Sequence, residues 1–537
     1  MRRIAGAAAL VAVLTITARL AGIARTLTFN WAVGPNDLGD IYLAANTVPN
    51  IIFEIVAGGA LASLVVPLLA GAVARGDRAS VGATASALLT WTVSILAPVA
   101  VAVALAAEPI MAALDRTASP DQIAVGAGML RVFAPQLPLY GIGIVLTGVL
   151  QAHHRFAWPV LAPLLSSVTV MGTYVAFALV DGKGTDLATV TPGGQLVLSI
   201  GTTLGVAVLT LCLLIPLRRL AVPLRPRYAV HVDLRRSLAR LAWAGAVTVA
   251  AQQVALVVVL KYALAAGPDD GAVVLFNLAQ TVYLLPWAVL AVPVATAAYP
   301  VLAANAATGE PDRYRATLAG ATRAVLLLSC LGAAALAALA GPTARLLIAV
   351  MPGDGPPPGQ LAGAIAAFAP GLVGYGLSAA LTRALYAHGN PGDAAFATVV
   401  GWAVVGVASA ALASALPAAD RVAALAAANS IGMTVLGAVL LVAVARRAGP
   451  GALDGLGRAA LAGFAGAGAG LAAGLVVGAA WHTPGVGATV VQGMLSGVAV
   501  ALGFLAVTYA IDRRDMTPLV ERVRRLVSGR GEQRVEG

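Results

Sequence analysis

Residues 18–69 read ARLAGIARTLTFNWAVGPNDLGDIYLAANTVPNIIFEIVAGGALASLVVPLL. Two long apolar blocks flank a polar turn at residues 34–37, and four further charges lie inside these blocks or at their edges. These charges are Arg19, Arg25, Asp40 and Glu54. A helix needs about 20 residues to cross a hydrocarbon core of roughly 30 Å. This stretch therefore predicts a helical hairpin in a membrane, with charges at depths where lipid is expected.

The apolar blocks continue through the whole chain of 537 residues, of which 60% are hydrophobic and 11% charged. Soluble domains carry about 25% charged residues, so a soluble protein and a disordered one are both excluded. The alternation typical of membrane β-strands is absent from the sequence. We predict an all-α polytopic membrane protein with about 14 transmembrane helices. The expected spans are 5–33, 39–73, 81–107, 123–152, 157–180, 194–217, 237–266, 271–303, 316–340, 360–387, 392–416, 420–445, 458–481 and 487–511.

The positive charges test this number of spans. With the N-terminus in the cytoplasm, 26 of the 34 Lys and Arg residues fall in cytoplasmic segments and only 4 in outer loops. Cytoplasmic loops of membrane proteins carry such an excess. We therefore expect a multi-pass protein of the inner (plasma) membrane with both termini in the cytoplasm. The net charge of +11 then reflects membrane insertion, and we expect no nucleic-acid partner.

The strongly basic loop after the sixth expected helix suggests a division into halves. We expect residues 1–217 to form an N-terminal lobe of helices 1–6, and 218–240 a basic cytoplasmic loop. Residues 241–447 then form a C-terminal lobe of helices 7–12, 448–511 an extra helix pair, and 512–537 a cytoplasmic tail. Two six-helix halves are a common transporter plan.

No catalytic or metal-binding constellation is recognisable in the sequence. The two cysteines, Cys212 and Cys330, both lie inside apolar blocks, so we expect neither a disulfide nor a metal site. No phosphate-binding glycine loop of the Walker type is present. We therefore predict a transporter without catalytic residues or a cofactor, driven by an ion gradient or the membrane potential, with the coupling ion left open.

Arg19 and Arg25 are the strongest candidates for a binding site. A charge at the bilayer centre costs several kcal/mol, so an intramembrane charge is a candidate functional residue. Arg19 lies near the middle of the first expected helix and Arg25 six residues further toward the outer side. Guanidinium groups bind phosphate oxygens in pairs, which suits a diphosphate. The alternative is that each arginine pairs with a buried carboxylate for structural reasons.

Asp40 and Glu54 lie 14 residues apart on nearly the same face of the second expected helix. Asp40 is expected either to orient Arg25 through a salt bridge or to be an acid favoured at a helix N-terminus. Glu54 is expected to pair with Arg19 or to carry a proton, with a plain internal ion pair as the alternative. Asn50, one turn before Glu54, is a further candidate, although such residues usually form interhelical hydrogen bonds.

Two other charges lie inside expected spans. Lys261, in the seventh expected helix, is a candidate substrate-binding residue, and snorkelling to the outer leaflet is its alternative. Arg131, near the outer start of the fourth expected helix, is expected to snorkel. The sequence alone does not place either residue near the arginines of the first helix.

The stretch quoted above resembles the opening of the MurJ/MviN family of lipid II flippases, within the MOP exporter superfamily. That family opens with a Ser-Arg-x-x-Gly-x-x-Arg-Asp segment followed by Asp-Ala-Phe and Pro-Asn motifs. GVLQAHHRFAWPVLAPLL, at 148–165, and TVYLLPWAVLAVPVATAAYPVLAANAATGEPDRYRATL, at 281–318, also resemble the family. The likeness runs from about residue 10 to about residue 390.

The resemblance implies two lobes around a cationic cavity, with a groove for a polyprenyl tail at the last two helices. By position, Arg19 and Arg25 match the family arginines thought to hold the diphosphate-sugar head, and Asp40 matches its helix 2 aspartate. Three positions depart from the pattern, because Thr26 replaces an aspartate, Phe53 and Glu54 replace an arginine pair, and Thr281 replaces an arginine. The Phe53-Glu54 variant is similar to that of actinobacterial members.

The resemblance therefore implies a flippase that moves lipid II, the undecaprenyl-diphosphate-linked peptidoglycan precursor, from the inner to the outer leaflet by alternating access. Its expected partners are this lipid or a similar polyprenyl-diphosphate lipid, the membrane, and cell-wall synthesis and division proteins. Three alternatives remain open. They are a flippase for another polyprenyl-linked saccharide, a multidrug or cation antiporter, and a non-transporting cell-wall scaffold.

Overall fold

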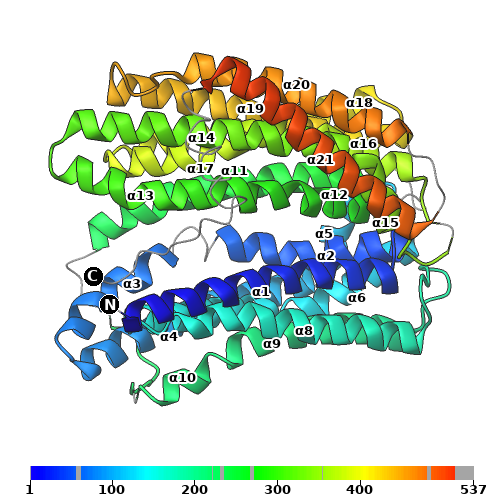
Figure 1. The fold of residues 1–537 in the computed structure, drawn as a ribbon. Helices are drawn as coiled ribbons and strands as arrows, with labels where there is room; N and C mark the ends of the chain where they lie inside the picture. Colours follow the sequence, from blue (N-terminus) through cyan, green and yellow to red (C-terminus); the bar gives the residue numbers. More distant parts are fainter. Residues whose placement is uncertain are drawn as a thin grey trace. The chain divides into compact units, whose positions relative to one another are not determined.

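The computed structural model of the protein describes residues 2–55, 62–220, 222–229, 235–265, 271–353, 355–480 and 485–513. Within these ranges every regular element is a helix (Figure 1). The predicted all-α fold is thus confirmed. The tail from residue 514 onward lies outside the described residues.

The chain forms two compact units, and each is described by itself. Unit 1 comprises residues 1–278 with the short segments 350–356 and 417–421, and unit 2 comprises the remainder. The helices of unit 1 are α1 (Arg2–Ala32), α2 (Asp37–Phe53), α3 (Ala62–Ala74), α4 (Arg78–Leu105), α5 (Ala107–Leu114), α6 (Pro120–Phe133), α7 (Gln136–Ala152), α8 (Ala157–Val180), α9 (Pro192–Leu211), α10 (Leu214–Arg218) and α11 (Arg235–Leu264).

Helix α12 (Ala272–Pro286) begins in unit 1 and continues into unit 2. The other elements of unit 2 are a π-helical turn η3 (Trp287–Ala291), α13 (Val292–Ala307), α14 (Pro311–Ala338), α15 (Ala340–Ile348), α16 (Pro358–Phe368), α17 (Gly371–Ala387), α18 (Pro391–Ala415), α19 (Arg421–Ala448), α20 (Leu456–Ala480) and α21 (Val486–Ile511). A 3-10 turn, η4 (Ala418–Asp420), precedes α19. The sequence predicts two six-helix lobes separated by the basic loop at residues 218–240, and this division into lobes stays a prediction.

The described helices are those of a membrane protein. Eleven of them are long and apolar enough to cross a membrane, and the pair α16/α17, bent by 41°, raises the number to as many as twelve. Helix α1 and the α2/α3 pair correspond in position to the first two expected spans. The structure is compatible with the predicted number of about fourteen, which remains a prediction.

Several expected spans are interrupted where proline occurs. The expected span 123–152 consists of α6 and α7, which meet at Pro135, and α16 and α17 meet at Pro370. Helix α12 ends at Pro286, where the chain passes into a π-helical turn. Proline lacks a backbone N–H and clashes with the carbonyl of the preceding turn, which breaks the regular ladder.

Glycine allows α20 and α21 of unit 2 to pack closely. A Cβ added at Gly470 would lie 2.8 Å from the backbone oxygen of Val500, and one at Gly474 would lie 2.5 Å from a methyl carbon of the same residue. Packing by small residues is the usual way in which helices associate in lipid. Glycines of α20 therefore serve close helix packing in unit 2.

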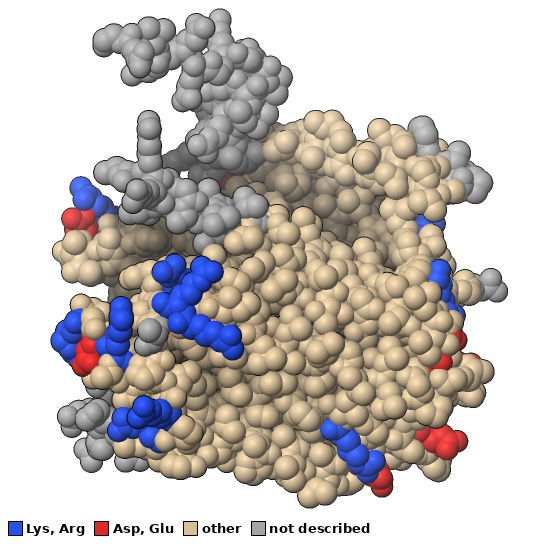
Figure 2. Space-filling view, turned by 90° about the horizontal axis from the view of Figure 1, so that it is seen from below, with Lys and Arg blue, Asp and Glu red and all other residues tan. Residues whose placement is uncertain are grey.

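One face of the molecule carries a broad uncharged band. In Figure 2, Lys and Arg side chains gather toward one side of this face, and uncharged surface separates them from the charges at the opposite side. Such a band fits a surface that contacts lipid. The expectation that Arg131 snorkels stays a prediction, and the structure adds a partner, because its Nη2 lies 2.7 Å from Oε1 of Glu108 on α5.

Part of the basic loop lies along α4 in unit 1. The backbone N–H of Arg225 donates to the Ser86 hydroxyl (2.9 Å), and that of Arg227 donates to the Thr90 hydroxyl (3.1 Å). The Trp91 indole N–H donates to the carbonyl of Tyr228 (3.1 Å). The loop is therefore not a free linker at residues 222–229, because hydroxyl groups at one-turn intervals on α4 hold it.

Candidate functional site

Helix α1 presents both candidate arginines on its surface. The side chains of Arg19 and Arg25 are exposed, and no ion pair or hydrogen bond of either is found among the described residues. Six residues correspond to about 9 Å along a helix and a turn of about 240°, so the two side chains leave α1 in different directions. Gly22 lies midway, and a Cβ added there would meet nothing within 4 Å. The helix surface between the arginines is therefore open.

A chain of hydroxyl groups lies near Arg25. The charge of Arg25 acts on the hydroxyls of Tyr42, Tyr140 and Tyr174, which come from α2, α7 and α8. The Tyr42 hydroxyl shares hydrogen bonds with those of Tyr174 (3.0 Å) and Thr202 (2.7 Å). Thr202 donates its own proton to the carbonyl of Leu198 (2.7 Å), so the donors run from Tyr174 through Tyr42 to Thr202. This network fixes the aromatic wall near the arginine.

Glu54 is the second charged group that acts on Tyr140. Its charge and that of Arg25 both act on the Tyr140 hydroxyl, so the structure brings the two groups to one region of unit 1. Glu54 follows the last residue of α2 and is exposed, and the ring of Phe53 packs on that of Tyr140 at 4.6 Å between centroids. The expected pair of Glu54 with Arg19 is not found among the described contacts.

Polar residues form a row along one side of α2. Asn46, Asn50 and Glu54 follow one another at intervals of four residues, which places them on one side of the helix. Asn50 is partly exposed, and its backbone carbonyl accepts a hydrogen bond from the N–H of Glu54. The side-chain oxygen of Asn46 is buried without a hydrogen-bond partner among the described residues. This polar row therefore extends along α2 and ends at Glu54.

Asp40 has a different role from the expected salt bridge with Arg25. It is 5% exposed, and its carboxylate accepts hydrogen bonds from the backbone N–H groups of Val274 (2.9 Å) and Val273 (3.2 Å). These groups belong to the first turn of α12, whose orphan donors and partial positive charge favour a carboxylate. Asp40 thus caps α12 and ties it to α2. The alternative expectation, an acid at a helix N-terminus, holds for two helices. Asp40 caps the N-terminus of α12, and it also lies in the first turn of its own helix, α2.

Lys261 is not brought to the other candidates by any described contact. It lies near the end of α11, and its side chain is exposed. Helix α11 packs on α2, α3 and α5 of unit 1. The snorkelling alternative and the binding alternative therefore both stay open for this residue.

The tyrosines near Arg25 were missed by sequence reasoning, which concentrated on charged residues. Tyr140 follows two prolines at 135 and 138, and Tyr42 lies two residues after Asp40. A phenol in an apolar span is a recognisable signal, because its hydroxyl usually needs a partner when buried. Their convergence from three helices could not be read from the sequence.

An apolar groove in unit 2 is a second candidate binding feature. It encloses about 700 Å³ between α14, α17, α19 and α20. Its lining is almost entirely apolar and includes Leu326, Val373, Phe464 and Leu471. Phe464 is 57% exposed, so one wall faces outward. Such a groove suits a hydrocarbon chain and offers nothing to an ion.

Comparisons with known proteins agree with one another. The family model described as "Lipid II flippase MurJ" matches residues 29–487. A "Lipid II flippase MurJ" of Burkholderia cenocepacia is 26% identical over 70% of this chain and 71% of its own length. A "Probable lipid II flippase MurJ" of Synechocystis sp. is 26% identical over 40% of each chain.

Solved structures with the same fold include two kinds of transporter. A lipid II flippase MurJ in an inward closed conformation matches with a TM-score of 0.72 and 18% identity, over 93% of this chain and 99% of that one. An inward-facing multidrug resistance MATE family transporter of the MOP superfamily matches with a TM-score of 0.64 and 15% identity, over 81% of this chain and 98% of that one. At these identities the matches show the fold alone.

Proposed function

Because the chain belongs to the lipid II flippase MurJ family, we propose that it carries lipid II from the inner to the outer leaflet of the plasma membrane. The observation that carries the proposal is the pair of exposed arginines on α1, for which the described residues supply no ion-pair partner. Two cations without counter-charges in a membrane segment are costly unless a ligand pairs with them. A diphosphate supplies that pairing, since Arg binds phosphate oxygens bidentately.

We propose that Arg25 holds the diphosphate, with Arg19 guiding it along α1. Glu54 lies close enough to act on the same tyrosine as Arg25, so it would compete with the diphosphate for the guanidinium and favour release. Tyr140 lies in the fields of both groups, and its hydroxyl can donate to a phosphate oxygen or to the carboxylate. Asn50 belongs to the same polar row on α2, and in this proposal its side chain contacts the head group. In this proposal Lys261 provides a further positive charge that contacts the anionic head group.

The apolar groove of unit 2 would hold part of the polyprenyl tail by van der Waals packing, since its lining is almost entirely apolar. Transport would proceed by alternating access, in which the head-group site opens to one side of the membrane at a time. No bond is made or broken in such a cycle. A membrane potential of 100 mV is worth about 2.3 kcal/mol per elementary charge and favours export of an anion from a negative interior. We propose that this potential or an ion gradient drives the cycle, with both termini in the cytoplasm.

Complementation tests the cargo and the site together. Cells depleted of their own flippase would express this protein or its variants at matched membrane levels, and lipid II exposed on the outer leaflet would be measured. We expect rescue by the wild-type protein, a loss of at least about tenfold in Arg25→Ala, and partial rescue by Arg25→Lys, since a charge-assisted hydrogen bond is worth roughly 1.5–3 kcal/mol.

Arg131→Gln is the matched control, because Arg131 already has a partner in Glu108 and lies outside the site. Full rescue by Arg25→Ala would remove the proposed site but keep the cargo. Failure of the well-inserted wild-type protein would contradict lipid II as the cargo in that host.

A flippase for another polyprenyl-linked saccharide is the second candidate. Phe53 and Glu54 stand where the resemblance implies an arginine pair, and Phe53 packs on Tyr140. The site is therefore less cationic and more aromatic than the family pattern implies, which suits a head group with fewer charges. Rescue of outer-leaflet exposure of a capsular or teichoic-type lipid-linked unit, together with no rescue of lipid II exposure, would favour this candidate.

A further inference from the structure

Helices α18 and α19 of unit 2 meet closely at one point and diverge from it. A Cβ added at Gly432 of α19 would lie 2.7 Å from the backbone oxygen of Gly401 on α18, so backbones touch there. The two helices are antiparallel, because only residues 416–420 join them. About 12 Å further along α18, the gap is bridged by long side chains, since Arg447 Nε lies 2.6 Å from Oδ2 of Asp393.

An apolar groove fills the space between the glycine crossing and this bridge. It encloses about 460 Å³ and is walled by Phe396 of α18 and by Val439, Val442 and Ala443 of α19. Phe396 is 65% exposed and Val442 is 50% exposed, so the groove opens sideways from the helices. A laterally open apolar groove on a membrane span faces lipid and can accept an acyl chain.

The mouth of the groove carries one surplus positive charge. Arg447 is neutralised by Asp393 through two hydrogen bonds, of 2.6 Å from Nε and 3.2 Å from Nη2. Arg446 is exposed and also lines the groove, and the part of the chain that the structure describes gives it no ion pair. The arrangement is thus an apolar slot with a single free guanidinium at its end.

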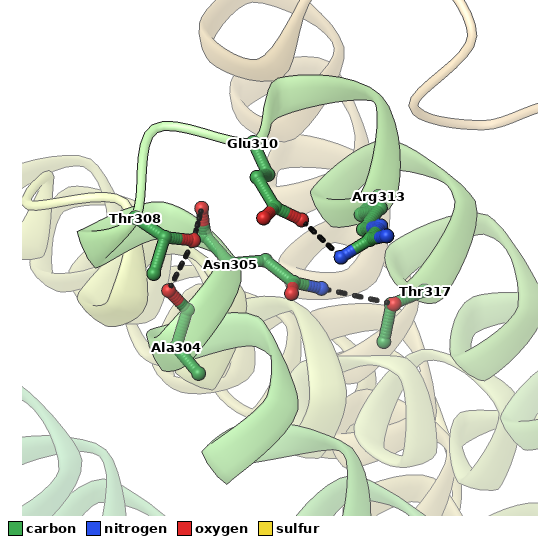
Figure 3. A network of polar contacts seen from close by, with 6 residues as sticks. All are labelled: Ala304, Asn305, Thr308, Glu310, Arg313 and Thr317. Carbon is green, nitrogen blue, oxygen red and sulfur yellow. Dashed lines mark hydrogen bonds and ion pairs between the residues drawn. The ribbon is translucent and has the colours of Figure 1, made fainter.

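A polar pocket on the other side of Arg447 provides a contrast. It encloses about 470 Å³ between the α13–α14 hairpin and the ends of α17 and α19. Its charged side chains are paired: Glu310 with Arg313 at 2.7 Å, as Figure 3 shows, and Arg315 with Asp312 at 3.0 Å. The hairpin closes on itself through Asn305, whose amide donates to the Thr317 hydroxyl (3.4 Å). The charged side chains at this pocket are thus paired, whereas Arg446 at the groove has no ion pair among the described residues.

We propose that the α18–α19 groove binds one monoanionic glycerophospholipid of the surrounding bilayer. Its acyl chain lies against Phe396 and Val442, and its phosphodiester accepts hydrogen bonds from Arg446. The charges match, because a phosphodiester carries one negative charge and the groove mouth one unpaired positive charge. Basic sites between membrane helices on the cytoplasmic side commonly hold anionic head groups. The leaflet is the cytoplasmic one if the orientation proposed above holds, and the proposal is otherwise independent of the transported cargo.

Native mass spectrometry of the purified full-length protein tests the site. The protein would be incubated in detergent with phosphatidylglycerol or with zwitterionic phosphatidylcholine, and bound lipids counted. We expect preferential retention of phosphatidylglycerol by the wild type and about tenfold weaker retention by Arg446→Gln, since the free cation is the only surplus charge of the groove. Arg446→Lys should recover part of the retention. Ala443→Phe keeps the charge but fills the slot, and it should release the lipid.

Arg313→Gln is the matched control, because it removes a cytoplasmic arginine beside the polar pocket and leaves the groove intact. Equal retention by wild type and Arg446→Gln would overturn the proposal, as would an equal loss in Arg313→Gln. Displacement of phosphatidylglycerol by a small excess of undecaprenyl phosphate would also overturn it, since the groove would then belong to polyprenyl lipids. Unchanged thermal unfolding of the Arg446 variants would exclude a folding defect as the cause.

Discussion

At the scale of single residues, the charged side chains of the first hairpin differ in whether the described residues supply them with a partner. The Asp40 carboxylate accepts hydrogen bonds from the backbone of α12, whereas Arg25 has no ion pair or hydrogen bond among the described contacts. A paired carboxylate stabilises the fold, and an unpaired guanidinium is available to a ligand. The two residues therefore have different surroundings, although both lie in the same predicted hairpin, and only Arg25 belongs to the proposed site.

Removal of the Tyr140 hydroxyl should lower transport without unfolding the protein. Tyr140→Phe keeps the ring contact with Phe53 and deletes the group that lies in the fields of Arg25 and Glu54. We expect several-fold slower lipid exposure in the complementation assay, because one hydrogen bond is worth about 1 kcal/mol. Tyr228→Phe, far from the site on the basic loop, is the control. Equal rates for Tyr140→Phe and the wild type would show that the hydroxyl takes no part.

Loss of the Asp40 carboxylate should destabilise the start of α12. Asp40→Ala leaves the N–H groups of Val273 and Val274 buried without an acceptor, and losing a cap costs about 1–2 kcal/mol. Asp40→Asn keeps an acceptor and should cost less. Faster hydrogen exchange at the first turn of α12, with a lower midpoint of thermal unfolding, is the expected result. Asp121→Ala, at an exposed position in the first turn of α6, should leave hydrogen exchange at α12 unchanged and lower the midpoint less than Asp40→Ala does.

At the scale of elements, α4 and the basic loop form an interlocked pair. Hydroxyls spaced one turn apart on α4 bind the backbone of residues 222–229, and Gly82 lets the loop approach. A Cβ added at Gly82 would lie 2.5 Å from the carbonyl oxygen of Pro223. The loop is therefore held by a complementary surface and not by its own sequence pattern.

Gly82→Val should release the loop from α4. The added side chain cannot occupy the same space as the Pro223 backbone, and a released segment is cut faster by proteases. We expect faster trypsin cleavage after Arg227, measured by mass spectrometry of the fragments, whereas Pro226 protects the bond after Arg225 in both proteins. Ala83→Val, one residue further along α4, is the control. Unchanged cleavage in Gly82→Val would mean that the loop is not held at this point.

Filling the apolar groove of unit 2 should separate tail binding from head-group binding. Ala467→Phe on α20 places a ring among the groove-lining residues, whereas Ala465→Phe lies outside that lining. We expect Ala467→Phe to weaken binding of a long polyprenyl diphosphate and to leave binding of a short-chain analogue unchanged, as measured by calorimetry on the purified protein. Equal weakening of both ligands, or none, would contradict a tail site in this groove.

At the scale of the whole molecule, the distribution of arginines along the sequence predicts an orientation that can be tested. In a background without Cys212 and Cys330, Arg219→Cys should react with a membrane-impermeant maleimide only after the cells are opened. Lys183→Cys should react in intact cells, because the two positions lie on opposite sides in the predicted topology. The reverse pattern would place the N-terminus outside.

The sequence by itself determined the class of the protein and the approximate positions of its helices, and it singled out the charged residues of the proposed site. Hydrophobic blocks and arginine counts suffice for this, because transfer into a bilayer and the positive-inside bias depend on composition and position along the chain. The structure gives two of these charges partners that the sequence did not indicate. Asp40 accepts hydrogen bonds from backbone groups 233 and 234 residues further along the chain, and Arg131 pairs with Glu108.

Only the tertiary structure decided which residues meet. The tyrosines that converge near Arg25 come from α2, α7 and α8, and the groove at Arg446 exists because α18 and α19 touch at glycines and then diverge. Contacts of this kind depend on how helix surfaces pack. Helices that are rich in small residues can approach one another closely on more than one face, so the sequence does not tell which faces meet. Periodicity places a residue on one face of a helix, but the neighbouring helix determines whether that face meets a partner, a ligand or lipid.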